Sequence, residues 1–182
     1  MKRINAALGL LSALLLLVHM GVQAYVYATF SYLPVLSKAT ALGFVIPTAV
    51  HALLSVCLLV FGSGRLRPDP YPKLNRRTTL QRVTALVILL LLPLHTNTFA
   101  LLQRSAGRLL PILALLLAEL VFFGMTLLHA GTSLSRGFIS LGWLDSLEKQ
   151  KRADRAIWIV LALLGVAAAA AVVRGQVMMF AG

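Results

Sequence analysis

Long apolar stretches dominate this 182-residue chain and limit what it can fold into. Five of them stand out, at about 6–30, 40–62, 79–102, 109–135 and 156–174. A helix needs about 20 predominantly apolar residues to cross the hydrocarbon core of a bilayer, and every stretch is close to that length or longer. We therefore predict an all-α membrane protein with five transmembrane helices, in a single transmembrane domain over residues 1–182.

The composition excludes an ordinary water-soluble protein. Apolar residues make up 59% of the chain and charged residues only 12%, whereas soluble domains are about 25% charged. The single cysteine, Cys57, excludes an internal disulfide or a cluster held by this chain alone. The first stretch follows Lys2 and Arg3 without a clear small-residue cleavage site, so we expect it to be a retained span.

The charges predict how the chain is oriented in the membrane. The net charge of +12 comes from 17 Lys and Arg against 5 Asp and Glu, and these residues gather between the apolar stretches. Counting Arg82, 13 Lys and Arg would lie on the face of the N-terminus and four on the opposite face. By the positive-inside rule the N-terminus is cytoplasmic. The charge is thereby explained without nucleic acid, and we expect the polar segment 136–155 to form a short amphipathic surface helix.

All the histidines of the chain lie inside predicted spans. His19, His51, His95 and His129 occupy the first four spans in order, one in each. Ionisable side chains within a bilayer are costly and usually face the bundle interior or a functional site. One such histidine is readily explained by a hydrogen bond to a neighbouring helix, but four on four successive helices favour a shared function.

The spacing of the histidines indicates a duplicated helical hairpin. His19 and His51 are 32 residues apart, and His95 and His129 are 34 apart. The first histidines of the two hairpins differ by 76 positions and the second ones by 78. A four-helix bundle built from two similar hairpins would account for these offsets.

The depth of the histidines predicts which ones pair. At 1.5 Å per residue, His19 and His95 lie about 20 Å from the cytoplasmic entry of their helices, and His51 and His129 lie closer to it. Each level thus holds two imidazoles from different hairpins, which is the ligand set of a bis-histidine haem. We predict two haems b, with the four histidines as axial ligands of the haem iron. Small residues nearby, such as Gly21 and Gly131, are compatible with the space that haem needs.

Two segments resemble a known family. LQRVTALVILLLLPLH (80–95) and LLHAGTSLSRGFISLGWLDSLEKQKRADRAIWIVLALLGV (127–166) are similar to the membrane-anchor cytochrome b of succinate dehydrogenases and fumarate reductases. Arg82 and Thr84 match its Arg-Ser/Thr motif, with Ala85 in place of a glycine. His129 matches a haem ligand and Gly142 a turn glycine. The dihaem anchors carry their ligands on helices one, two, four and five, whereas this chain carries them on its first four.

The resemblance implies an electron-transfer function. Such anchors bind an iron–sulfur subunit, which docks a flavoprotein subunit that interconverts succinate and fumarate. The chain alone would not be catalytic: it would pass electrons between the iron–sulfur partner and a membrane quinone, menaquinone or ubiquinone, in a bacterial cytoplasmic membrane. The basic segments 63–78 and 136–155 are the expected docking surface, and a higher oligomer of the complex stays open.

The resemblance also implies a quinone site, and the sequence offers one acid for proton transfer. Thr78, Gln81 and Arg82 match the quinone-binding cluster at the cytoplasmic mouth of the third span, although Arg82 could equally be an interfacial side chain. Glu119 is the only acid within a span, about 15 Å outward from His129. It could accept a proton from a quinol, or it could make a structural hydrogen bond to a neighbouring helix.

Two other functions are compatible with the sequence. One is a cytochrome b anchor of another quinone-linked enzyme, of the formate dehydrogenase or hydrogenase type. The other is a haem-free small transporter or assembly protein that uses its histidines for protons or a metal. Bound haem separates the second alternative from the cytochrome functions.

Overall fold

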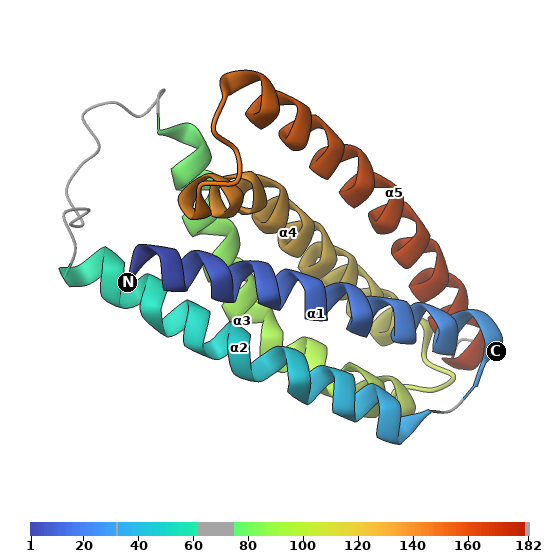
Figure 1. The fold of residues 1–182 in the computed structure, drawn as a ribbon. Helices are drawn as coiled ribbons and strands as arrows, with labels where there is room; N and C mark the ends of the chain where they lie inside the picture. Colours follow the sequence, from blue (N-terminus) through green and yellow to red (C-terminus); the bar gives the residue numbers. More distant parts are fainter. Residues whose placement is uncertain (32, 62–74, 181–182) are drawn as a thin grey trace.

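The protein is a bundle of long helices (Figure 1). The structure is a computed structural model that describes residues 1–31, 33–61 and 75–180. Its helices are α1 (Lys2–Thr29), α2 (Pro34–Phe61), α3 (Arg76–Arg104), α4 (Leu109–Leu141) and α5 (Leu147–Phe180). All five are long and apolar enough to cross a membrane, which confirms a multi-pass all-α membrane protein with five candidate spans.

Successive helices run in opposite directions, so the two termini lie at opposite ends of the bundle (Figure 1). We call the end that holds the N-terminus, the start of α3 and the α4–α5 connection the basic end, and the other the far end. Among the described residues, α4 approaches α1, α3 and α5, whereas α2 comes within 8 Å of α1 alone, measured between Cα atoms. The hairpins α1–α2 and α3–α4 therefore meet mainly through α1 and α4, and α5 covers both of these helices.

The polar segment 136–155 differs from its prediction as a separate surface helix. Helix α4 continues to Leu141, and α5 begins at Leu147 and runs on through the polar residues into the apolar stretch. Gly142 has a φ of 85°, and the N–H groups of Gly142 and Trp143 donate to carbonyls of the last turn of α4. A residue with φ in this range ends a helix, and glycine adopts it without a steric penalty. The prediction was wrong because nothing after residue 147 breaks the helix.

The exposed charges of the α4–α5 connection are paired along the chain. Lys149 contacts Asp145 at 2.9 Å, and Arg152 contacts Glu148 at 3.7 Å, each pair four residues apart. The hydrogen bond from Lys149 and its positive charge hold the pKa of the Asp145 carboxyl below its usual value. Such pairs favour helix at the start of α5.

Glycines allow close contacts between α5 and the other helices. A Cβ atom at Gly131 of α4 would lie 2.5 Å from the indole of Trp158, and one at Gly175 would lie 2.2 Å from the ring of Tyr27. Gly131 thus makes room for an aromatic side chain of α5, although the sequence had placed it beside a cofactor. At the far end, Arg174 donates to the carbonyl of Ala28 at 2.9 Å, which joins α5 to the end of α1.

The contact between Gly131 and Trp158 gives a prediction for stability. We expect Gly131→Ala to lower the thermal unfolding midpoint in detergent, because the added methyl group must displace the indole; overpacking of this kind costs about 1–3 kcal/mol. Gly124→Ala in the same helix is the matched control, since a Cβ there meets nothing within 4 Å. Equal midpoints for the two variants would contradict the prediction.

Candidate cofactor site: four histidines at two levels

In the first hairpin, each histidine contacts an acceptor on the other helix. The Nδ1 atom of His19 on α1 lies 3.2 Å from the hydroxyl of Thr40 on α2. This hydroxyl donates to the carbonyl of Leu36 at 3.0 Å, so it accepts from the ring. The Nδ1 atom of His51 on α2 lies 2.9 Å from the backbone carbonyl of Asn5 on α1. Both rings therefore carry their proton on Nδ1.

The second hairpin repeats this arrangement. The Nδ1 atom of His95 on α3 lies 2.8 Å from the carboxylate of Glu119 on α4. The Nδ1 atom of His129 on α4 lies 3.0 Å from the backbone carbonyl of Gln81 on α3, with the hydroxyl of Thr84 at 3.3 Å. Each helix of this hairpin thus orients the imidazole of the other.

The acceptors follow the internal repeat of the sequence. The carbonyls of Asn5 and Gln81 each belong to the residue 14 positions before the histidine of the same helix. Thr40 and Glu119 lie 11 and 10 positions before His51 and His129. The two hairpins therefore share both their histidines and the positions that orient them, which supports a duplicated hairpin.

Each histidine lies near one histidine of the other hairpin. His19 is close enough to His95, and His51 to His129, for electrostatic interaction between the rings. These are the pairs expected from depth, the first nearer the far end and the second nearer the basic end. Among the described residues, α1 and α3 have no Cα atoms within 8 Å of each other, and neither have α2 and α4. The helices that share a histidine pair are thus the ones that stay apart.

The donor set fits a haem at each level. With Nδ1 protonated, Nε2 keeps its lone pair, and none of the four Nε2 atoms has a hydrogen-bond partner within residues 1–31, 33–61 and 75–180. Histidines that bind a metal usually donate their other N–H to a carbonyl or carboxylate in this way. In the same part of the chain, no three His, Cys, Asp or Glu residues gather to hold a metal ion. Two facing imidazoles suffice for haem iron, whose remaining ligands come from the macrocycle, but not for zinc.

Gly9 shapes the position of His51. A Cβ atom on Gly9 would lie 2.9 Å from Cε1 and 3.2 Å from Nδ1 of the imidazole. The ring therefore lies directly against the backbone of α1, one turn beyond the carbonyl of Asn5 that accepts its proton. Sequence analysis singled out small residues next to the histidines and missed this glycine, which acts on a histidine of the other helix.

Glu119 lies within the site near the far end. Its side chain is 5% exposed, and it accepts hydrogen bonds from His95 and from the hydroxyl of Thr98. The imidazole of His95 also stacks on Phe122, with ring centroids 4.4 Å apart. These contacts provide the structural role weighed for Glu119 from the sequence, and its role in proton transfer stays a prediction.

The residues assigned to quinone binding lie at the start of α3 but have different environments. Thr78 accepts a hydrogen bond from Arg136 of α4 at 2.8 Å. Gln81 uses its backbone carbonyl to orient His129. Arg82 is exposed. The structure thus brings Thr78 and Gln81 to the contact with α4 and leaves Arg82 on the surface of the bundle.

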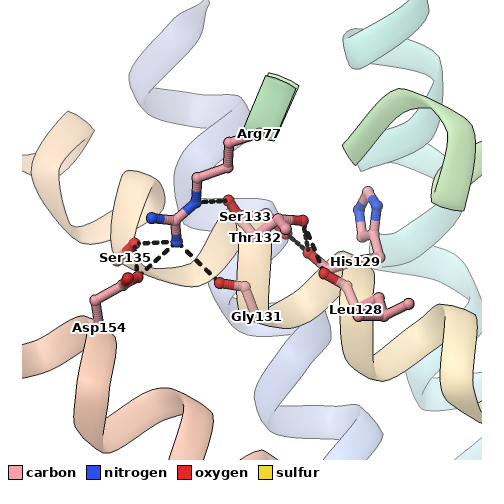
Figure 2. Close-up of polar contacts among 8 residues, drawn as sticks. All are labelled: Arg77, Leu128, His129, Gly131, Thr132, Ser133, Ser135 and Asp154. Carbon is pink, nitrogen blue, oxygen red and sulfur yellow. Dashed lines mark hydrogen bonds and ion pairs between the residues drawn. The ribbon is translucent and has the colours of Figure 1, made fainter. Parts of the chain in front are cut away.

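A charged network at the basic end was not anticipated from the sequence. Figure 2 shows the guanidinium of Arg77 between α4 and α5, with His129 on the adjoining part of α4. Arg77 donates to the carbonyls of Gly131 and Thr132 at 2.9 and 3.0 Å, to the hydroxyl of Ser135 at 2.8 Å, and to Asp154 of α5 at 2.6 Å. The sequence held one signal for it. The chain has few acids, and an acid at the start of a predicted span needs a positively charged partner.

Comparison of the chain with protein-family models, with curated proteins and with solved structures gives no match. The interpretation of the site therefore depends on its own geometry.

The contact between Gly9 and His51 gives a prediction for cofactor binding. We expect Gly9→Ala to lower the amount of haem bound through His51, because the methyl group displaces the imidazole from its acceptor. Gly43→Ala is the matched control on the helix that carries His51, since a Cβ there meets nothing within 4 Å. Haem per chain, measured by the pyridine haemochrome assay, should fall for the first variant alone; equal haem contents would contradict the role of Gly9.

Proposed function

We propose that this chain is a haem b-containing membrane subunit that transfers electrons between a peripheral iron–sulfur partner and membrane quinone. The observation that carries the proposal is the common arrangement of the four histidines. Each ring is oriented by an acceptor of its own hairpin and lies near enough to a ring of the other hairpin for electrostatic interaction between the two. If the histidines served only as hydrogen-bonding residues, this would account for their acceptors but not for their pairing between hairpins.

The residues of the site would hold and orient the cofactor. Haem b, when bound, supplies one-electron transfer at each level. His51 and His129 would present Nε2 nearer the basic end, and the backbone carbonyls of Asn5 and Gln81 keep these rings in one tautomer. His19 and His95 would do the same nearer the far end. The two levels would give electrons a route between the basic end and the lipid-embedded part of the bundle.

The basic end is the proposed docking surface for the partner. Exposed cations gather there on the first turns of α5, at Lys149, Lys151, Arg152 and Arg155. Such a surface favours association with an acidic face of another protein. The segment 62–74 of the predicted docking surface lies outside the described residues. By resemblance we propose an iron–sulfur subunit as the partner, joined to a succinate- or fumarate-converting flavoprotein, and a quinone near Thr78, Gln81 and Arg82.

Paired histidine substitutions test the cofactor and its ligands together. We expect two haems b per wild-type chain, and one after either His51→Ala or His129→Ala. The double variant His51→Ala/His129→Ala should still bind one, because both changes remove ligands of the same haem. The cross-level variant His19→Ala/His51→Ala should bind none. Pyridine haemochrome assays and reduced-minus-oxidised spectra of the purified protein measure these contents.

The other outcomes are equally specific. Pairing within each hairpin would reverse the results of the two double variants. A wild-type chain without haem would overturn the proposal and favour a transporter or assembly protein. Asn97→Ala serves as the control, since this exposed polar residue lies two positions from His95 and, among the described residues, bonds only to its own helix. Its haem content should equal that of the wild type.

The enzyme served by the subunit is tested through its partner. We expect the chain, purified in mild detergent from its native membrane, to retain an iron–sulfur protein and a flavoprotein that reduces quinone with succinate or forms succinate from fumarate. Activity with formate or hydrogen instead would keep the cytochrome function and assign the chain to the other class of quinone-linked enzyme.

A further inference from the structure

Two guanidinium groups lie close together at the basic end, and one carboxylate compensates them. Arg77 and Arg136 are near enough to repel each other. Asp154 pairs with Arg77 at 2.6 Å and is also held by Ser135 at 2.9 Å. Among the described residues, no acid lies within ion-pair distance of Arg136. Within the described part of the chain, the second positive charge is therefore left without an anion.

Arg136 is not a freely solvated side chain. It is half-buried, and its guanidinium donates to the hydroxyl of Thr78 at 2.8 Å. A neutral hydroxyl replaces one hydrogen bond to water but does not balance the charge. A partly desolvated cation beside a second cation is unfavourable unless an anion joins it. The position therefore calls for a negatively charged ligand.

The same position is aligned with the histidine pair nearer the basic end. Arg136 lies seven residues after His129, which puts both side chains on one face of α4 about 10 Å apart along the helix axis. Its partner Thr78 lies one turn before Gln81, whose carbonyl orients His129. Arg136 and Thr78 thus form the next polar layer toward the basic end from the pair of His51 and His129.

We propose that Arg136 and Thr78 form an anion-binding subsite that holds a propionate carboxylate of the haem bound between His51 and His129. This inference depends on the proposed function. Arg136 and Thr78 would hold a propionate of this haem that is directed toward the basic end, because they form the next polar layer in that direction. A guanidinium suits a carboxylate because it offers parallel N–H donors.

A lipid phosphate has related chemistry and is the other possible source of the anion. The two sources differ in what they leave in the purified protein. If a propionate binds Arg136, a substitution of Arg136 changes the redox equilibrium of one haem. If a lipid headgroup binds Arg136, the substitution lowers the number of tightly bound anionic lipids.

Redox titration of the detergent-purified complex tests the proposal with three variants. Arg136→Gln should shift the reduction equilibrium of one haem toward the oxidised form by roughly tenfold, about 59 mV for a one-electron couple. The shift follows because a nearby cation stabilises the reduced, more electron-rich haem. Arg136→Lys keeps the charge and should restore most of the equilibrium. Lys2→Gln, which removes an exposed cation at the same end, should shift neither haem.

Haem content and bound phosphorus complete the measurement. Two haems with unchanged midpoint potentials in Arg136→Gln would overturn the propionate assignment while the proposed function stands. Loss of a bound lipid phosphate without a shift in potential would assign the subsite to a lipid headgroup and would also overturn the propionate assignment. Absence of haem from the wild-type protein would instead be the failure of the proposed function. Because His129 is unchanged, Arg136→Gln should retain both haems, which separates the shift from a loss of fold.

Discussion

A ring N–H in hydrocarbon needs an acceptor, and this requirement organises the bundle. Water is not available at the depth of the histidines, so each imidazole must find its partner within the protein. Here every partner lies on the adjacent helix of the same hairpin, and two of the partners are backbone carbonyls. These bonds fix the rotation of each helix about its axis relative to its neighbour.

At the basic end, the N–H donors of a half-buried cation likewise need acceptors within the protein. Arg77 uses α4 carbonyls, a hydroxyl and Asp154 to satisfy its donors, so it joins α3, α4 and α5 through one side chain. Its carbonyl acceptors, Gly131 and Thr132, lie two and three positions after His129 on α4. The conformation of the segment that carries a candidate ligand is therefore linked to the position of α5, whose first turns form the proposed docking surface.

The sequence predicted the spans and the grouping of the histidines because both depend on distance along a helix. Apolar length sets where a helix can cross, and the rise per residue sets the depth of a side chain. Segment ends were less predictable: α4 and α5 extend past the apolar stretches, since residues 136–155 include good helix formers and only Gly142 interrupts them. The prediction of a separate surface helix failed for this reason.

The environment of the site could be predicted only in part. Glu119 stood out because it is a lone acid in a span, and it does contact a histidine. The carbonyls of Asn5 and Gln81 carry no signature, because every residue has a carbonyl and its use depends on the neighbouring helix. Gly9 and Arg77 were missed for a similar reason, since each acts on a residue more than 40 positions away.

The location of all four acceptors within single hairpins bears on the order of assembly. Each pair of helices can orient its own imidazoles as soon as the two helices lie side by side in the membrane, before the other pair arrives. The histidine-bearing face of either half is therefore complete when the halves meet. A flat ligand could be captured as the halves close on it, and it would not have to enter a bundle that had already formed.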